Sequence, residues 1–112
     1  MKLVKAIIRP SKLDEVTEAL TAAGVQGITV VTVHGFGRQK GHKTVYRGQE
    51  YLVHFIEKKM IEITTNDEDA ERIAKIIIKY ARTGEVGDGK IFISSIDNAI
   101  RIRTGEEGEK AV

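Results

Sequence analysis

One glycine-rich segment has residue types and a spacing that suit phosphate binding. Residues 82–90, the glycine loop, contain Gly84, Gly89 and Lys90 in the order G-x-x-x-x-G-K. In a P-loop this spacing surrounds phosphate oxygens with free backbone N–H groups, and the lysine adds positive charge. However, Ile91 stands where a serine or threonine would hold Mg²⁺, and the segment follows a predicted helix and precedes a strand. The pattern therefore disfavours a P-loop hydrolase, but it leaves both a phosphate site and a plain helix-to-strand turn open.

A second candidate anion site lies near the C-terminus. In residues 99–104, which are predicted as a short strand, arginines alternate with isoleucines. Because strand side chains alternate between faces, Arg101 and Arg103 would share one face and could bind an anion. The alternative is a solvated edge strand whose charges prevent aggregation. Together with Lys90 and Arg38, the two arginines would suit a polyphosphate better than open solvent.

The segment 35–51 connects two predicted strands and carries glycines, basic residues and two tyrosines. No apolar period of a helix or a strand runs through it, so it is predicted to be a long exposed loop. Compact domains rarely keep a loop of this length without a function. We therefore expect this loop to report on a ligand or to contact a partner.

The composition gives little support to other chemistries. The chain has no cysteine, which excludes disulfides, thiolate metal sites and cysteine nucleophiles. His34, His42 and His54 lack a metal-ligand spacing, and no Ser-His-Asp order or paired-carboxylate arrangement stands out. Residues 34–37 match the start of an RNA-binding RNP1 motif, but the match fails after Gly37. With three Phe, three Tyr and a net charge of +2, no nucleic acid partner is expected.

Two helices are predicted to position these segments. Ser11 is the expected N-cap of the first helix and Gly24 ends it, while Asn66 is the expected N-cap of the second helix, which leads to the glycine loop. Acidic residues in the first turns of both helices suit the helix dipole. The expected buried stripes are Leu13, Val16, Leu20 and Ala23 in the first helix and Ala70, Ile73, Ile77 and Tyr80 in the second.

The extended segments alternate with these helices in the order β-α-β-β-α-β. They are residues 2–9, 28–35, 51–65 and 90–94, with the short 99–104 at the end. This order predicts a single α+β domain with the ferredoxin-like split βαβ fold, in which two helices cover one face of a four-stranded antiparallel sheet. Residues 2–9 and 28–35 are apolar on both sides. A second apolar face needs a cover, so we expect a homo-oligomer; scattered surface valines are the alternative.

These motifs occur together in a known family. The chain resembles the P-II nitrogen-regulatory signalling proteins over essentially its whole length. The matching segments are residues 35–42, 46–48, 50–51, 82–84, 87–92 and 101–105. The resemblance implies a ferredoxin-like subunit that assembles as a homotrimer with nucleotide sites between subunits. It also implies three functional loops, namely an effector loop at about 37–54, the glycine loop, and a C-terminal loop at 102–112.

The same resemblance implies an ATP or ADP site. The phosphates would contact Arg38 and the glycine loop of one subunit, and Arg101 and Arg103 would reach in from the neighbour. Other residues would lie beside the base. The nucleotide-binding residues that it implies are Ile7, Thr29, Arg38, Glu62, Thr64, Gly87, Asp88, Gly89, Lys90, Arg101 and Arg103.

The resemblance further implies that 2-oxoglutarate binds only together with Mg-ATP. Gln39 would ligate the Mg²⁺ with phosphate oxygens and the oxo-acid, and Lys58 would pair with the distal carboxylate. These roles are chemically consistent, because Mg²⁺ prefers oxygen ligands and a dianionic acid needs a cation. The implied 2-oxoglutarate residues are Gly37, Gln39, Lys40, Gly41, Lys58 and Gly87.

The implied output is a protein contact rather than catalysis. Tyr46, Arg47 and Gly48 would contact an ammonium transporter of the Amt type, or a nitrogen-metabolism enzyme or regulator. Because no signal peptide or membrane-length apolar run is found, a cytoplasmic protein is expected, which reaches a membrane only through the channel. Tyr51 matches a tyrosine that some members carry uridylylated or adenylylated, although aromatic packing alone could explain it. A slow nucleotide hydrolase built on the glycine loop is the alternative function.

Some positions depart from the residues that are usual in this family. Ser11 replaces a phenylalanine, and His54 and Glu57 replace an aspartate and a proline. Gln49 replaces a serine that some members phosphorylate. Glu57 is expected to place a carboxylate beside Lys58, the implied 2-oxoglutarate contact.

Overall fold

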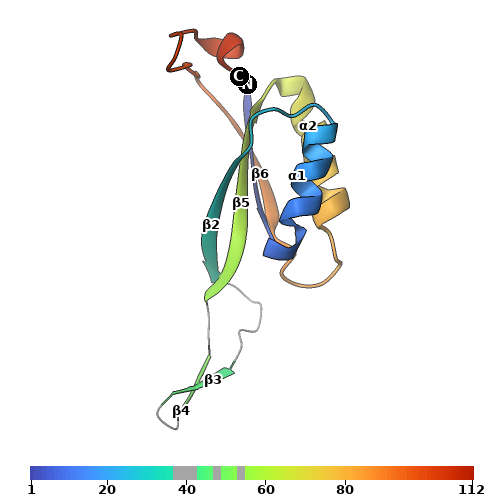
Figure 1. Ribbon diagram of the computed structural model, residues 1–112, viewed down its shortest axis with the longest axis vertical. Helices are drawn as coiled ribbons and strands as arrows, with labels where there is room; N and C mark the ends of the chain where they lie inside the picture. Colours follow the sequence, from blue (N-terminus) through green and yellow to red (C-terminus); the bar gives the residue numbers. More distant parts are fainter. Residues whose placement is uncertain (37–42, 47–48, 53–54) are drawn as a thin grey trace.

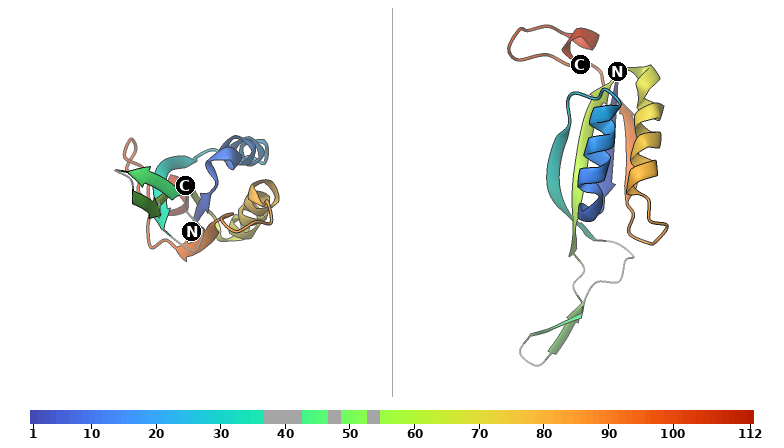
Figure 2. Two further views of the ribbon diagram at one scale, coloured as in Figure 1. Left: turned by 90° about the horizontal axis from the view of Figure 1, so that it is seen from below. Right: turned by 45° about the vertical axis from the view of Figure 1, so that its right-hand side comes forward.

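The computed structural model describes residues 1–36, 43–46, 49–52 and 55–112. Its main sheet has four strands in the order β2-β5-β1-β6, and all three neighbouring pairs are antiparallel. The strands are β1 (Lys2–Ile8), β2 (Thr29–Phe36), β5 (Phe55–Thr65) and β6 (Lys90–Ser95). The helices α1 (Leu13–Ala22) and α2 (Asp67–Ala81) lie side by side on one face of this sheet (Figures 1 and 2). The predicted α+β, ferredoxin-like fold is therefore confirmed.

The core lies between the helices and the face of the sheet that they cover. From Val4 on, every second residue of β1 points into it, and these residues are almost completely buried. The core residues are Val4, Ala6, Ile8, Val16, Leu20, Ile61, Ile63, Ala70, Ile73, Ile77 and Ala81. Tyr80, which was expected in the stripe of α2, is 36% exposed, and Ala81 takes its place. Positions four apart share a helix face, so Ile73, Ile77 and Ala81 continue the stripe while Tyr80 turns away from it.

The first helix begins later than predicted. Residues Pro10–Lys12 form a 3₁₀ turn, and the N-cap of α1 is Lys12, so the prediction of Ser11 as N-cap is wrong. Pro10 fixes the backbone at the first position of this turn and delays the α-helix by one short turn. At the other end Gly24 has a φ of 93°, and its N–H donates to the carbonyl of Thr21 at 3.0 Å. The predicted glycine stop is confirmed there.

Asn66 is the N-cap of the second helix, as predicted, but its side chain makes no capping hydrogen bond. The N-terminal ammonium of Met1 instead forms an ion pair of 2.8 Å with Asp67 in the first turn. This contact ties the start of β1 to the start of α2. The hydrogen bond from this ammonium, and then its positive charge, are the main causes that lower the pKa of Asp67.

The segment 35–51 contains more structure than the sequence predicted. Residues Lys43–Tyr46 (β3) and Gln49–Leu52 (β4) pair as a two-stranded antiparallel hairpin. The predicted run 51–65 is accordingly divided, because its first residues belong to β4 and β5 begins at Phe55. The sequences of both short strands contain β-branched or aromatic residues, and a glycine lies between the two strands. This combination is typical of a β-hairpin. The hairpin was not predicted from the sequence because this segment lacks apolar alternation.

The predicted final strand at residues 99–104 is wrong. Only an isolated bridge joins Ile100 to Glu107, and Gly108–Ala111 form a 3₁₀ helix. Gly105 has a φ of 74° and its N–H donates to the carbonyl of Arg101 at 2.7 Å, so the chain turns back on itself. The C-terminal segment (residues 99–112) therefore folds as a small unit at one end of the molecule, opposite the end that carries β3 and β4 (Figure 1).

No described element covers the face of the sheet that lies away from the helices, which we call the open face. Cross-strand partners point to the same face, and the row Val31, Met60, Ile7 and Lys90 crosses all four strands there. Val31 is 42% exposed and Phe92, one row further along, is 50% exposed. The expectation that the first two strands carry a second apolar face is consistent with this arrangement.

Truncating one of two neighbouring isoleucines in α2 tests the assignment of the core face. Ile77 is 1% exposed and Ile78 is 40% exposed. We expect Ile77→Ala to lower the free energy of unfolding by about 2–5 kcal/mol, because it leaves a cavity. Ile78→Ala should cause a clearly smaller loss. Urea unfolding followed by circular dichroism at one protein concentration measures both, and equal losses would contradict the packing described here.

Candidate functional site

Asp88 joins the two ends of the glycine loop. Its carboxylate accepts hydrogen bonds from the N–H groups of Thr83 and Gly84 at 2.9 and 2.8 Å, and from the Thr83 hydroxyl at 2.5 Å. The Nε–H of Arg9, directly after β1, donates to the same carboxylate at 3.1 Å. These bonds, led by that from the Thr83 hydroxyl, hold the pKa of Asp88 well below its ordinary value. The carboxylate is therefore a charged structural clasp at neutral pH.

The glycines of this loop are required by its backbone. Gly84, Gly87 and Gly89 have φ values of 91°, 106° and 97°, in the left-handed region that other residues rarely adopt. A Cβ atom on Gly89 would lie 1.7 Å from the carbonyl oxygen of Ile7. Gly89 therefore allows the loop to pass directly against β1 before β6 begins.

Two carbonyl groups of the loop are held by cations that extend from the sheet. The Nη2 group of Arg9 donates to the Val86 carbonyl at 2.8 Å, and the Lys58 ammonium donates to the Gly87 carbonyl at 2.5 Å. Within the described residues, the N–H groups of Gly87 and Asp88 donate to no backbone or side-chain acceptor. Free N–H groups of a glycine-rich turn are the donors that bind anions such as phosphate.

Lys58 supplies a buried positive charge below the loop. The residue is only 8% exposed. Burial lowers its pKa first, the nearby Arg9 guanidinium lowers it further, and Asp88 opposes the shift. A buried cation in such surroundings is stabilised by an additional anion, so the position favours a negatively charged ligand.

Lys58 and the loop residues Val86, Gly87 and Gly89 line a cavity of about 480 Å³ on the open face, whereas Asp88 lines a different hollow. The lining of this cavity comes from the end of β2, the start of β5, β1, the glycine loop and β6. The lining residues are Ile7, Gly35, Phe36, Ile56, Lys58, Val86, Gly87, Gly89, Lys90 and Phe92. The structure thus brings together a subset of the predicted site residues, namely Ile7, Lys58, Gly87, Gly89 and Lys90.

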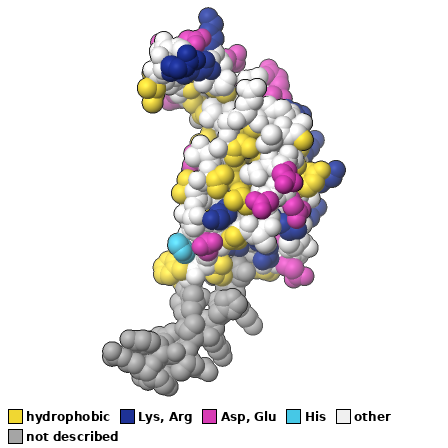
Figure 3. Space-filling model, viewed as in Figure 1, with side chains coloured by type: hydrophobic (Ala, Val, Ile, Leu, Met, Phe, Trp, Pro, Cys, Tyr) yellow, Lys and Arg dark blue, Asp and Glu magenta, His cyan; other side chains and the backbone are white. Residues whose placement is uncertain are grey.

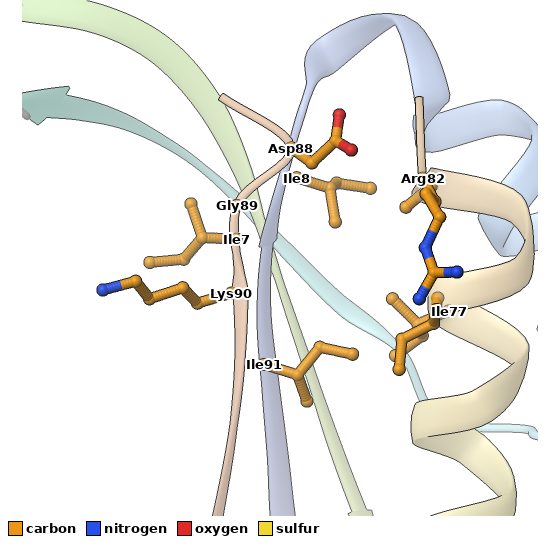
Figure 4. Close-up of a pocket in the computed structure, with 10 residues that line it drawn as sticks. Ile7, Ile8, Ile77, Arg82, Asp88, Gly89, Lys90 and Ile91 are labelled. Atoms are coloured by element: carbon orange, nitrogen blue, oxygen red, sulfur yellow. The ribbon is translucent and has the colours of Figure 1, made fainter. Parts of the chain in front are cut away.

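Figure 4 shows the lining of a second hollow, which lies by β1, β6 and α2 on the helix side of the sheet. The second hollow, of about 360 Å³, has a mostly apolar wall that includes Ile8, Ile77 and Ile91. In Figure 4 the side chains of Lys90 and Ile7 point away from α2, toward the open face. The ammonium of Lys90 therefore belongs with the cavity of the open face.

Other predicted nucleotide residues lie on the open face but outside this cavity. Thr29 and Glu62 are cross-strand partners, and Thr64 pairs with Leu3 one row further along. None of these three residues lines either cavity described above. Within one chain they lie farther along the sheet from the glycine loop than Ile7 does.

The predicted anion-binding arginines of the C-terminal segment lie still farther away. Basic side chains gather on this segment, at the end of the molecule opposite β3 and β4 (Figures 1 and 3). Arg101 donates to the Glu106 carboxylate at 3.4 Å and to the Lys110 carbonyl at 3.1 Å. Arg103 is exposed. One chain therefore does not bring Arg101 and Arg103 to the glycine loop.

The remaining predicted site residues lie outside the described part of the chain, at least as regards their side chains. They are Gly37, Arg38, Gln39, Lys40, Gly41, Tyr46, Arg47, Gly48 and Tyr51. Of these, only the backbones of Tyr46 in β3 and Tyr51 in β4 are placed. Their ligand and partner roles stay predictions.

Arg9 and Thr83 were not predicted as site residues, although both hold the glycine loop. A signal for Arg9 was present in the strand register. Ile7 pairs with Lys90, so the antiparallel order carries Arg9 toward Asp88. The role of Thr83 depends on the turn of the loop, which no periodic pattern reveals.

Glu57 does not face the same side of the sheet as Lys58. Consecutive strand residues point to opposite faces, and Glu57 is the cross-strand partner of His34 on the helix side. The expectation that Glu57 places its carboxylate beside Lys58 is therefore wrong. The departure from the usual proline does not add a negative charge to the cavity.

The described residues offer neither a metal cluster nor a membrane span. No group of three or more His, Asp or Glu residues is arranged to hold a metal ion there. No helix in that part of the chain is long and apolar enough to cross a membrane.

A glycine pair in the loop tests the close approach to β1. Gly84→Ala has open space for its Cβ, so it should cost about 1–2 kcal/mol, from the left-handed backbone alone. Gly89→Ala should lower the free energy of unfolding by more, because its Cβ would clash with the Ile7 carbonyl. Thermal unfolding of both variants measures the difference, and a tolerated Gly89→Ala would refute the approach.

The Asp88 clasp predicts a specific acid sensitivity. Because the folded-state pKa of Asp88 lies below its ordinary value of 3.8, its stabilisation is complete above that value and is lost as the pH falls below it. Asp88→Asn should therefore be less stable than the wild type at pH 7, and should lose less stability than the wild type as the pH falls from about 4 to about 2. The control is Asp97→Asn, an exposed carboxylate outside the loop, which should retain the wild-type acid dependence.

Comparison with known proteins identifies the family. The chain matches the family model "Nitrogen regulatory protein P-II" over residues 1–106. It is 59% identical over 112 residues to the nitrogen regulatory protein P-II of Rhodobacter capsulatus, with 100% of both chains covered. It is 54% identical to the nitrogen regulatory protein P-II 2 of Methanothermobacter thermautotrophicus, covering 100% of this chain and 97% of the relative. The crystal structure of Arabidopsis thaliana PII bound to citrate matches with a TM-score of 0.81 and 40% identity, covering 99% of this chain and 91% of that one. The chain belongs to the P-II family of nitrogen regulatory proteins.

Proposed function

We propose that this P-II protein senses adenine nucleotides at the glycine loop and passes the state of this site to a target protein. The proposal rests on the hydrogen bonds of the glycine loop. Its acceptors are tied down by Arg9 and Lys58, while N–H groups of Gly87 and Asp88 have no acceptor in the described residues. Lys90 adds a positive charge on the same face. ATP and ADP both carry the diphosphate that such a site would bind.

The proposed site needs more than one copy of the chain. Thr29, Glu62 and Thr64 lie away from the glycine loop, and Arg101 and Arg103 lie near the opposite end of the molecule. A neighbouring subunit could supply these groups to the cavity. The same assembly would cover the apolar open face, whose exposure is otherwise unfavourable. We therefore propose a homotrimer with the nucleotide between subunits.

Lys58 is the proposed contact for the distal carboxylate of 2-oxoglutarate, which would bind together with Mg-ATP. Its burial and its lowered pKa both favour a nearby anion. The related Arabidopsis thaliana PII was crystallised bound to citrate, which is a polycarboxylate. Gln39 would complete the Mg²⁺ coordination with phosphate and oxo-acid oxygens, as Mg²⁺ prefers. These effector and metal roles are part of the proposal.

The proposed output is a change in the effector loop at 37–54. Its Tyr46, Arg47 and Gly48 would contact a cytoplasmic target, either an Amt-type ammonium channel or a nitrogen-metabolism enzyme. Ligands would act by binding one loop conformation more tightly than another, since only such a difference shifts the populations. Modification of Tyr51 would add bulk and negative charge to the same contact.

Titration calorimetry with ADP, ATP and 2-oxoglutarate, with and without Mg²⁺, tests this function. Lys90→Ala and Arg103→Ala should each weaken ADP and ATP alike, by roughly 10- to 100-fold, because a charged hydrogen bond to phosphate is lost. Gln39→Ala should spare ADP and remove the Mg²⁺-dependent binding of 2-oxoglutarate. Lys75→Ala on α2 is the control for a lost positive charge.

Each result of this titration decides a part of the proposal. The absence of nucleotide binding by the wild-type protein at millimolar concentrations would overturn it. Identical behaviour of Gln39→Ala and Lys90→Ala would refute the division between metal and phosphate roles. Phosphate release that continues over many turnovers and disappears in Lys90→Ala would favour a hydrolase instead.

A further inference from the structure

Arg9 bridges two separate points of the glycine loop. Its Nε–H donates to the Asp88 carboxylate at 3.1 Å and its Nη2 group donates to the Val86 carbonyl at 2.8 Å. The side chain of Arg9 is 24% exposed and that of Asp88 is 25% exposed, so both are mostly shielded from water. Arg9 lies directly after β1, one of the two central strands, which pairs with both β5 and β6. The loop is thereby anchored to an interior strand of the sheet and not to an edge strand alone.

The geometry of this bridge requires an arginine. A guanidinium presents its donors in a rigid planar fork, so it can hold a carboxylate and a carbonyl at fixed relative positions. An ammonium also has several donors but no rigid planar fork, so it would not fix the two acceptors at these relative positions. The bridge therefore fixes the orientation of the peptide units between Val86 and Asp88, which include Gly87.

Those peptide units carry the N–H groups of Gly87 and Asp88, which donate to no acceptor among the described residues. Arg9 holds the Val86 carbonyl and Lys58 holds the Gly87 carbonyl, so both acceptors are turned toward the sheet. The N–H group of a peptide unit points opposite to its carbonyl, because the unit is planar and trans. Holding these two carbonyls therefore directs the N–H groups of Gly87 and Asp88 away from the cations.

We propose that Arg9 is a positioning residue for the phosphate site, acting through Asp88 and the Val86 carbonyl rather than by contact with the ligand. This inference rests on the proposed nucleotide function. Its role is to keep the glycine loop in its anion-receptive conformation before a ligand arrives. Preorganisation of this kind raises affinity because less ordering remains to be done on binding.

The chain contains a matched control for this arrangement. Arg72 in α2 donates from Nε to the Asp69 carboxylate at 3.3 Å and from Nη1 to the Ala23 carbonyl at 3.2 Å. Like Arg9, it donates to one acidic side chain and one backbone carbonyl, but it lies in the helix layer. Arg72→Met thus removes an equal charge and an equal number of contacts at a distance from the loop.

A double-mutant cycle tests whether Arg9 acts through the loop. ADP affinity is measured by calorimetry for wild type, Arg9→Met, Asp88→Asn and the double variant. We expect each single variant to bind ADP about tenfold more weakly, the effect of losing one charged hydrogen bond. The double variant should bind no more weakly than the weaker single variant, because both changes disable one bridge. Arg72→Met should bind ADP as the wild type does.

Other outcomes would overturn the inference. If the two losses multiply in the double variant, Arg9 contacts the ligand directly or acts independently of Asp88. If Arg9→Lys binds ADP like the wild type, only the charge matters and the fork does not. Loss of affinity in Arg72→Met equal to that in Arg9→Met would reduce the effect to a general loss of stability.

A ligand-free measurement separates this inference from the proposed function. The backbone amide resonances of Gly84, Gly87 and Gly89 should move in Arg9→Met and Asp88→Asn, and should not move in Arg72→Met. If they move as expected while the wild-type protein binds no nucleotide, the positioning of the loop stands and the nucleotide function fails. If they do not move, Arg9 does not position the loop, whatever the protein binds.

Discussion

The ionised carboxylate of Asp88 is the contact on which the rest of the site depends. It receives hydrogen bonds from Thr83 and Gly84 at the start of the glycine loop and from Arg9 after β1. Together with the bonds from Arg9 and Lys58 to the Val86 and Gly87 carbonyls, these bonds hold the loop between the end of α2 and the start of β6. The position of Lys90 depends on the same loop, because Gly89 packs against the Ile7 carbonyl and β6 begins at the next residue, Lys90.

The two faces of the sheet divide the tasks of the molecule. One face packs against both helices and supplies the stability of a single domain. The other face carries predicted site residues in rows that run from the glycine loop toward the opposite end, with Ile7 and Lys90 in one row and Thr29 and Glu62 in the next. A strand pattern that is apolar on both sides is thus explained by a core on one side and, as proposed, by a surface shared between subunits on the other. In the proposed trimer, a ligand that binds between subunits would couple its binding to the association of the subunits.

The parts of the structure that local patterns determine were predicted from the sequence, and the parts that depend on distant partners were not. The strands and helices of the main layer follow from apolar periodicity and from stops such as Gly24. The N-cap at Ser11 was wrong because a proline turn precedes the helix, and the strand at 99–104 was wrong because Gly105 reverses the chain. Of the site, the glycines and Lys90 could be found by their spacing, whereas Arg9 required the register between β1 and β6.

Lys58 gives a physical reason why an effector at this site would change the loop. Its ammonium already donates to the Gly87 carbonyl, and burial together with Arg9 disfavours its charge. If 2-oxoglutarate binds at Lys58 as proposed, its carboxylate competes with the Gly87 carbonyl for the same donors. A carboxylate is the stronger acceptor for an ammonium group. Binding would therefore weaken one anchor of the glycine loop while Arg9 and Asp88 keep the other, and by reciprocity a nucleotide that orders the loop would alter the affinity for the oxo-acid.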